Sequence, residues 1–175
     1  GPMRWVAVGA VSTLGLMALP GCSSDDDEGE GTLRVTIYGE PYIEQGIPAV
    51  EFVDGWAVTF SSFEIAVTDV RADGTDVEGG AQWQLAMDTE GEGQLYGETT
   101  MPAGTVAHLD YRITAVHAVG EATRGGDTFA FDWSFDTDTT YVDCETEQSL
   151  ADGGSATSQM TIHADHLFYD DLVSD

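Results

Sequence analysis

The sequence predicts an all-β protein, an antiparallel β-sandwich of about seven strands that follows a signal helix and a disordered acidic tether. Several stretches after residue 31 alternate apolar and polar residues with a period of two, which is typical of half-buried strands. Pairs such as Asp-Gly and Gly-Gly separate these stretches and favour tight turns. Between the turns, no stretch has the apolar period of an amphipathic helix.

The opening strand is predicted over residues 32–38, where three aliphatic residues share one face: Leu33, Val35 and Ile37. Residues 40–54 contain Pro41 and Pro48, which favour a loop that crosses to the next strand.

The most strongly β-forming stretch is Trp56 to Val70, but its apolar residues fall into two phases. The phase slips at Ser61-Ser62, between Phe60 and Phe63. A one-residue shift turns every following side chain to the other face, so we expect a β-bulge or a break at the serines.

Asp73-Gly74 predicts a hairpin turn, and a short strand is expected over Trp83 to Met87. Residues 90–97 are rich in Gly and Glu and predict a loop. The long strand that follows is expected over Thr105 to Val119, with His117 on its apolar phase.

The next strand is predicted over Asp127 to Phe135, with four aromatic residues facing inward: Phe129, Phe131, Trp133 and Phe135. We expect a turn at 136–138, a short strand at 140–144, a loop at 145–155 and a final strand at 156–163. Residues 165–172 are expected to begin a helix or a capping turn.

The N-terminus starts with a basic residue, Arg4, and continues as an apolar run from Trp5 to Leu19. This run suits a signal peptide and is short for a membrane span, which needs about 20 apolar residues. It ends at Leu19-Pro20-Gly21-Cys22, which resembles the lipobox of bacterial lipoproteins, although proline replaces the usual Ala or Ser. The resemblance implies that Cys22 is lipidated and becomes the new N-terminus, and that Ser23 suits delivery to the outer membrane.

This assignment divides the chain into a signal peptide (1–22), a flexible acidic linker (23–31) and a β-sandwich domain (32–175). A secretory signal or a transmembrane anchor is the alternative for the first region. Lipid on Cys22 would leave Cys144 without a disulfide partner. A lone thiol in an oxidising compartment indicates a partner lost by C-terminal truncation, a buried inert thiol or a metal ligand.

The charge of the chain is strongly negative. The formal net charge is −27, and the five basic residues are all arginines. Such a surface repels nucleic acid and anionic membrane surfaces, which excludes both as ligands. It is compatible with cation binding, with a salty habitat, or with simple solvation of the surface.

A second resemblance rests on the layout of the mature chain. An opening strand, a strand followed by Asp73-Gly74, and Pro102-Ala103-Gly104 leading into Leu109-Asp110-Tyr111-Arg112-Ile113 are similar to uncharacterised secreted lipoprotein domains. The resemblance implies an immunoglobulin- or transthyretin-like sandwich and brings no catalytic residues with it.

The best candidate for chemistry is His163-Ala164-Asp165-His166, at the end of the last predicted strand. Two imidazoles and a carboxylate could reach one cation where the chain curls, and these donors suit zinc or copper. The alternative is that His166 caps a terminal turn and that His163 is exposed. His117 would be a further ligand or a core histidine satisfied by one hydrogen bond.

Calcium is a weaker possibility, because residues 69–76, 136–143 and Asp152 are acidic but lack the spacing of a helix-loop-helix calcium site. The chain has no Gly-x-Ser-x-Gly motif and no phosphate-binding glycine loop. The sequence therefore predicts a lipid-anchored, extracytoplasmic and non-catalytic domain that binds an unknown protein or small molecule. A structural or adhesive surface module is the first alternative, and a hydrolase with an unrecognised site is the second.

Overall fold

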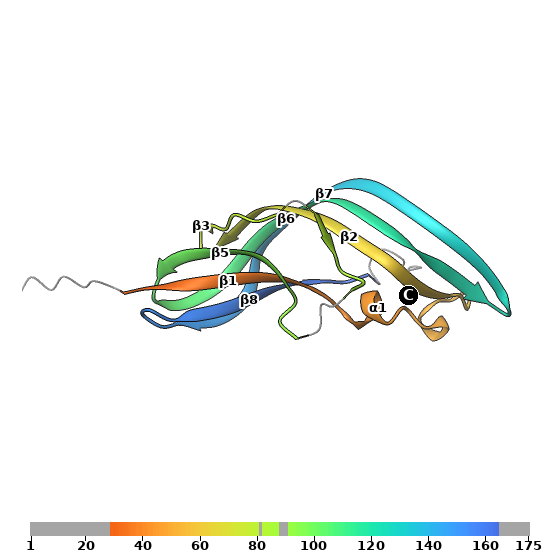
Figure 1. Ribbon diagram of the computed structural model, residues 1–175, viewed down its shortest axis with the longest axis horizontal. Helices are drawn as coiled ribbons and strands as arrows, with labels where there is room; N and C mark the ends of the chain where they lie inside the picture. The colour runs from red at the N-terminus through yellow and green to blue at the C-terminus, as the bar shows by residue number, and fades with distance from the viewer. Residues whose placement is uncertain (1–28, 81, 88–90, 165–175) are drawn as a thin grey trace, which may run out of the picture.

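The computed structural model describes residues 29–80, 82–87 and 91–164, which form an all-β sandwich of two sheets (Figure 1). This confirms the predicted fold class. The strands are β1 (Glu30–Gly39), β2 (Ala57–Ala72), β3 (Thr75–Asp76), β4 (Gln82–Gln84), β5 (Gln94–Pro102), β6 (Gly104–Arg124), β7 (Asp127–Leu150) and β8 (Ser155–Ile162). The predicted signal peptide, most of the predicted linker and the predicted helix or turn at 165–172 lie outside the described residues.

The smaller sheet has the strand order β5-β1-β8. β1 pairs with β8 in parallel, from Thr32 opposite Ser155 to Gly39 opposite Ile162, whereas the other strand pairs of both sheets are antiparallel. The alternation of apolar and polar residues in β1 is confirmed, because its aliphatic residues are fully buried: Leu33, Val35 and Ile37.

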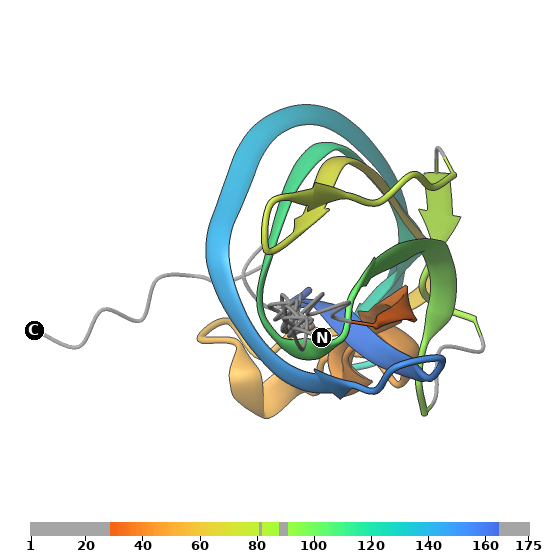
Figure 2. The same cartoon turned by 90° about the vertical axis from the view of Figure 1, so that its left-hand side faces the viewer.

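The larger sheet has the order β3-β2-β6-β7, and β4 also pairs with β2. β6 and β7 form a hairpin of 21 and 24 residues, and its turn uses Gly125 and Gly126 at φ of 59° and 93°. Positive φ at both turn positions favours glycine there. Seen end-on, this sheet curls strongly around the interior (Figure 2).

The serine slip in β2 is a bulge, as predicted. The register with β6 shifts between Phe60 and Ser62, and Phe63 and Ile65 are both fully buried beyond it. The Asp73-Gly74 turn between β2 and β3 is also confirmed, with φ of 45° and 83°.

The segment between β1 and β2 contains one turn of α-helix, α1 (Pro41–Glu44), and one turn of 3-10 helix, η1 (Ala49–Glu51). Ile43 and Ile47 from this segment are buried. Ile47 also exchanges two backbone hydrogen bonds with Val58, at 2.7 and 2.9 Å. The predicted crossing loop therefore packs onto β2 and contributes to the core.

Several predicted breaks are wrong. The turn at 136–138 and the loop at 145–155 are largely strand, because β7 continues to Leu150. The register of β7 with β6 shifts where the turn was expected, and Asp143 and Glu147 have positive φ, so bulges bend the strand without ending it. β5 occupies residues predicted to be a loop or a lead-in.

The same bulges explain the position of His117. Its strand changes phase between Ile113 and Val116, which are both buried, so His117 points away from the core. The prediction of a core histidine is therefore wrong.

The four aromatic residues of β7 are on the predicted face but are not part of a closed core. They lie opposite Val116, Ala118, Gly120 and Ala122 of β6, and Val116 and Ala118 are buried. Phe129, Trp133 and Phe135 are nevertheless 60%, 49% and 42% exposed. The smaller sheet does not cover this part of the larger one.

Candidate ligand-binding cleft

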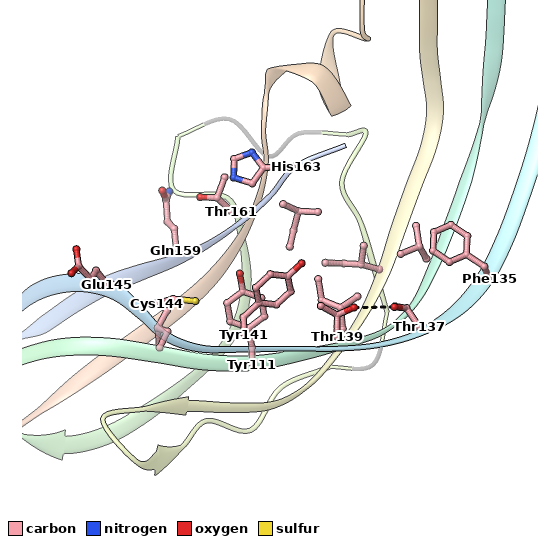
Figure 3. A pocket seen from close by; sticks show the side chains of 15 residues that line it. Tyr111, Phe135, Thr137, Thr139, Tyr141, Cys144, Glu145, Gln159, Thr161 and His163 are labelled. Carbon is pink, nitrogen blue, oxygen red and sulfur yellow. Dashed lines mark hydrogen bonds between the residues drawn. The ribbon is translucent and has the colours of Figure 1, made fainter. Parts of the chain in front are cut away.

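A cleft of about 400 Å³ lies between β6 and β7 of the larger sheet and β8 of the smaller one (Figure 3). Its floor is aliphatic and comes from β2, β6 and β8. The 15 lining residues are Ile65, Leu109, Tyr111, Ile113, Val116, Phe135, Thr137, Thr139, Tyr141, Cys144, Glu145, Gln159, Thr161, Ile162 and His163.

The cleft is open because the chain changes sheets between β7 and β8. β7 pairs with β6, whereas β8 crosses over to pair with β1. In the described ranges, β7 and β8 do not pair with each other and no further strand pairs with both. The sandwich therefore stays open along this side. Tyr141, on the wall formed by β7, is 41% exposed as a result.

Tyr111 and Tyr141 form the aromatic wall of the cleft. They lie opposite each other in the β6–β7 register and stack with ring centroids 5.0 Å apart and planes inclined by 25°. Tyr111 is almost completely buried, whereas the outer ring of Tyr141 faces the cleft. The stacked pair gives a ligand a flat surface at the entrance.

Cys144 follows Tyr141 along β7, and its thiol shares a hydrogen bond with Tyr111 on β6. Burial raises the pKa of the Tyr111 hydroxyl well above its usual value, and the adjacent Cys144 adds to the shift. Burial also raises the pKa of the Cys144 thiol, with a further contribution from Asp110. Both groups therefore stay protonated and uncharged at neutral pH.

The opposite wall is polar and comes from β8 and the residue that follows it. Gln159, Thr161 and His163 border the cleft there. The Oε2 atom of Glu40 lies 3.0 Å from Nδ1 of His163, and its Oε1 atom accepts a hydrogen bond from the backbone N–H of Ala164 at 3.1 Å. This largely buried carboxylate fixes the end of β8 and the orientation of the imidazole.

The chemistry of the lining is close to neutral. Glu145 is the one carboxylate among the lining residues and no arginine is present, although the chain carries 32 acidic residues. Hydroxyl and amide groups supply most of the remaining polarity. Such a lining suits an uncharged ligand with an apolar body and a few hydrogen-bonding groups.

The predicted metal ligands are only partly described. Asp165 and His166 lie outside the described residues. His163 borders the cleft, whereas His117 lies on the opposite face of the larger sheet, so the two histidines do not form one site. Among residues 29–80, 82–87 and 91–164, no group of three His, Cys, Asp or Glu side chains could hold a metal ion.

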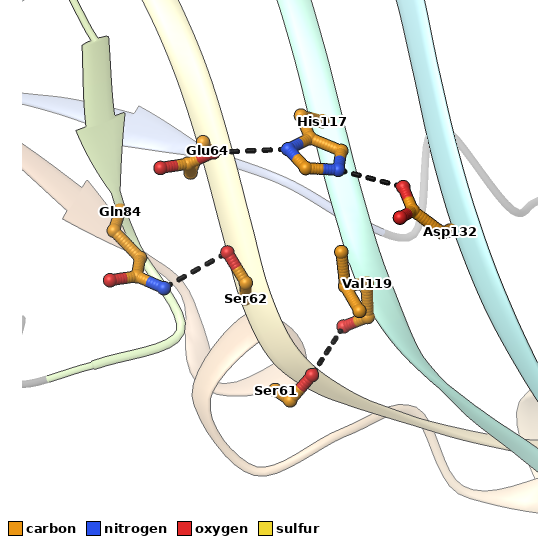
Figure 4. Close-up of polar contacts among 7 residues, drawn as sticks. All are labelled: Ser61, Ser62, Glu64, Gln84, His117, Val119 and Asp132. Atoms are coloured by element: carbon orange, nitrogen blue, oxygen red, sulfur yellow. Dashed lines mark hydrogen bonds and ion pairs between the residues drawn. The ribbon is translucent and has the colours of Figure 1, made fainter.

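His117 instead bridges two neighbouring strands on the outer face (Figure 4). Its Nδ1 lies 3.1 Å from Oε2 of Glu64 on β2, and its Nε2 lies 2.8 Å from Oδ1 of Asp132 on β7. These hydrogen bonds raise the pKa of His117, with the bond to Asp132 contributing most. The imidazole thus links three strands.

Arg112, which precedes His117 on β6, makes the same kind of contacts. Its guanidinium lies 2.6 Å from Asp138 on β7 and 3.6 Å from Asp69 on β2. The ion pair raises the pKa of Arg112 and lowers that of Asp138. The central strand β6 therefore carries two basic residues, His117 and Arg112, that contact acidic residues of both neighbouring strands.

Four of the acidic residues considered for calcium, Asp69, Asp73, Asp76 and Asp138, use their carboxylates within the protein. Asp73 accepts hydrogen bonds from the backbone N–H groups of Ala107 and His108, and Asp76 pairs with Arg71 at 2.8 Å. Residues 136–143 are part of β7 and form no loop. Asp73 and Asp76 therefore already have partners within the protein.

The residues of the cleft were not recognised from the sequence. Thr137, Thr139 and Tyr141 repeat with a period of two, next in space to the apolar phase that contains Leu109, Tyr111 and Ile113. This row of hydroxyl-bearing residues is the sequence feature that indicates the wall of the cleft. The turn predicted at 136–138 interrupts the row, so the row is not recognised as part of one strand.

Within the described part of the chain, no helix is long and apolar enough to cross a membrane. Comparisons of the chain with protein-family models, with curated proteins and with solved structures found no match.

Proposed function

We propose that this protein is a lipid-anchored, extracytoplasmic and non-catalytic binding domain, and that the cleft between β7 and β8 holds an uncharged, largely apolar small molecule. The single observation that carries the proposal is the lining of the cleft. It combines an aliphatic floor with a stacked tyrosine pair and hydroxyl groups, and its one carboxylate is Glu145.

The protonation states of the lining support the same ligand class. The raised pKa values of Tyr111 and Cys144 keep both groups neutral, so neither attracts a charged ligand at pH 7. A protonated thiol is also a poor nucleophile, which favours binding over covalent chemistry at Cys144.

The proposed location rests on the N-terminal sequence. The apolar run that ends at Leu19-Pro20-Gly21-Cys22 favours lipidation of Cys22, and the acidic residues 23–31 would serve as a spacer to the domain. A bacterial cell envelope, with the outer membrane favoured by Ser23, is the proposed site of action. Mass spectrometry of the membrane fraction should find a diacylated Cys22, and an unmodified peptide running through Gly21-Cys22 would remove this premise.

A metal site near the end of β8 is a second candidate. Glu40 holds the imidazole of His163 through Nδ1, and carboxylates orient ligating histidines in zinc sites in this way. Asp165 and His166, which follow in the sequence, would complete the donor set for zinc or copper. A structural or adhesive module is the remaining alternative, and it requires neither ligand.

The cleft is tested by titrating Cys22→Ser protein with Nile red, a neutral apolar dye whose fluorescence rises in apolar surroundings. Thr139→Trp should fill the cleft and weaken binding by about tenfold or more. Thr140→Trp is the matched control, because Thr140 is the next residue of β7, pairs with Arg112 and points to the opposite face. Equal binding by both variants would overturn the proposed site.

A further inference from the structure

The outer edge of β7 has no strand partner in the described residues. The sheet order places β7 at one end, and β8, the next strand in the chain, pairs with β1. From Asp127 to Asp136, β7 pairs with β6 in unbroken register, so this ten-residue stretch is a regular strand on a hairpin that extends beyond the smaller sheet (Figure 1). Its free edge presents a row of backbone donors and acceptors.

One face of this edge carries an aromatic row, Phe129, Phe131, Trp133 and Phe135. Three of its four members are between 42% and 60% exposed. The row is held in place from within the sheet, because Phe131 packs edge-on against Phe60 at 6.0 Å and lies 5.1 Å from Trp133. Aromatic side chains exposed together along one strand indicate an interaction surface.

The tip of the hairpin is anchored in a similar way. Phe129 contacts Trp56 edge-on at 5.5 Å, and the guanidinium of Arg124 stacks over the ring of Trp56 at 4.5 Å. Arg124 also donates a hydrogen bond to the backbone oxygen of Asp54 at 3.2 Å. These contacts hold Phe129, the first residue of the aromatic row, in a fixed position.

The other face of the same edge is acidic. Asp132 and Asp136 point there with Ser134 between them, and Asp132 is the one that His117 contacts from β6. Natural proteins commonly protect an exposed edge with charged side chains, especially lysine, or with proline. Residues 127–136 contain no lysine or proline, and their charged residues are Asp127, Asp132 and Asp136. The edge therefore combines an apolar face with a negative one.

We propose that residues 127–136 of β7 bind an extended segment of a partner protein by strand addition, and that this segment alternates apolar with cationic side chains. Backbone hydrogen bonds would supply the pairing, the aromatic row would receive the apolar side chains, and Asp132 and Asp136 would pair with the cations. This site is separate from the proposed function of the cleft, although Phe135 borders both.

The charge argues against a second copy of the chain as the occupant. Antiparallel pairing of two β7 edges around Ser134 would place Asp132 of one copy opposite Asp136 of the other. Like charges directly opposite destabilise a strand pair, and each copy also carries a formal charge of −27. A basic strand avoids both the repulsion between opposed aspartates and the repulsion between two negatively charged chains.

The test uses Cys22→Ser protein and a fluorescein-labelled, capped ten-residue peptide of alternating valine and lysine, with binding followed by fluorescence anisotropy. An alternating valine–glutamate peptide and a valine–lysine peptide with alternate backbone amides N-methylated are the probe controls. We expect each to bind about tenfold more weakly or worse, because one loses charge complementarity and the other the backbone hydrogen bonds. Equal binding by the N-methylated peptide would overturn the proposal in favour of simple adsorption.

Variants of the protein locate the site. Trp133→Ser combined with Phe129→Ser should weaken binding of the valine–lysine peptide about tenfold, and Asp132→Asn combined with Asp136→Asn several-fold. Leu95→Ser, which removes an exposed apolar side chain on β5, is the matched control and should leave binding unchanged. Thr139→Trp should also leave peptide binding unchanged, which separates this site from the cleft.

Three other results would overturn the proposal. Equal peptide binding by the aromatic variant, in protein whose circular dichroism shows it folded, would place the site elsewhere. A dimer found by sedimentation that Trp133→Ser disrupts would identify a second copy as the occupant. Peptide binding that requires deletion of residues 165–175 would assign the edge to the chain itself.

Discussion

The rings of Tyr111 and Tyr141 stack across β6 and β7 with their centroids 5.0 Å apart, and they form the aromatic wall of the cleft. Tyr141→Ala removes the exposed member of this pair. Aromatic contacts of this kind contribute about 0.5–1.5 kcal/mol beyond area burial, so Nile red binding should weaken about three- to tenfold. Val142→Ala is the control, because Val142 is the next residue and is 64% exposed away from the cleft. Equal effects of both substitutions would argue against the tyrosine wall.

Cys144 reports on occupancy of the cleft. In Cys22→Ser protein it is the remaining cysteine, and its thiol borders the cleft beside Tyr111. Since burial raises the pKa of this thiol, alkylation by N-ethylmaleimide at pH 7 should be slower than that of a free thiol. Saturation with Nile red should slow it about fivefold or more by blocking access. The rate of alkylation is measured by mass spectrometry. An equal rate with and without the dye would place the dye elsewhere.

His117 should make stability depend on pH. Its bonds to Asp132 and Glu64 raise its pKa in the folded protein, so the stabilisation is complete below the unfolded value of 6.5 and is lost as the pH rises through the folded value. His117→Gln should therefore lower the melting temperature more at pH 5.5 than at pH 9. The same substitution in an Asp132→Asn background should show a smaller pH dependence. A loss in melting temperature that is the same at both pH values would contradict the ion-pair assignment.

The metal site predicts stabilisation by zinc or copper. At a concentration about 100 times the dissociation constant, a bound ion adds about 2.7 kcal/mol, which raises the melting temperature of a domain of this size by roughly 5–10 °C. His163→Ala should abolish the rise in Cys22→Ser protein. His108→Ala, which removes a histidine beside Asp73, should retain it. An unchanged melting temperature with either metal would remove this second candidate function.

The local features of the fold could be predicted from the sequence where one strand decides them. The alternation in β1 placed Leu33 and Ile37 in the core, and the phase slip at Ser61-Ser62 marked a bulge. The Asp73-Gly74 turn followed from residues that tolerate positive φ. Each depends on the period of two or on turn chemistry, which neighbouring residues determine.

The features that depend on distant strands could not be predicted. A bulge opposite Thr114 resembles a turn in sequence, so the sequence predicts a break in β7 at 136–138 and a core position for His117. The period of two predicts the correct face for the aromatic row of β7, but the burial of these side chains depends on how far the smaller sheet extends. The cleft exists because β8 pairs with β1. No local sequence pattern around Tyr141 or Thr161 predicts that pairing.

The most direct test of the cleft is an NMR titration of ¹⁵N-labelled Cys22→Ser protein with Nile red. The amide resonances that shift should belong to residues around the cleft, above all Tyr111, Tyr141 and Thr161. Glu64 and His117, on the outer face of the same sheet, should stay unchanged. Saturable shifts at the three cleft residues would support an uncharged ligand between β7 and β8. Shifts confined to the outer face, or no saturable shift at Tyr111 and Tyr141, would contradict it.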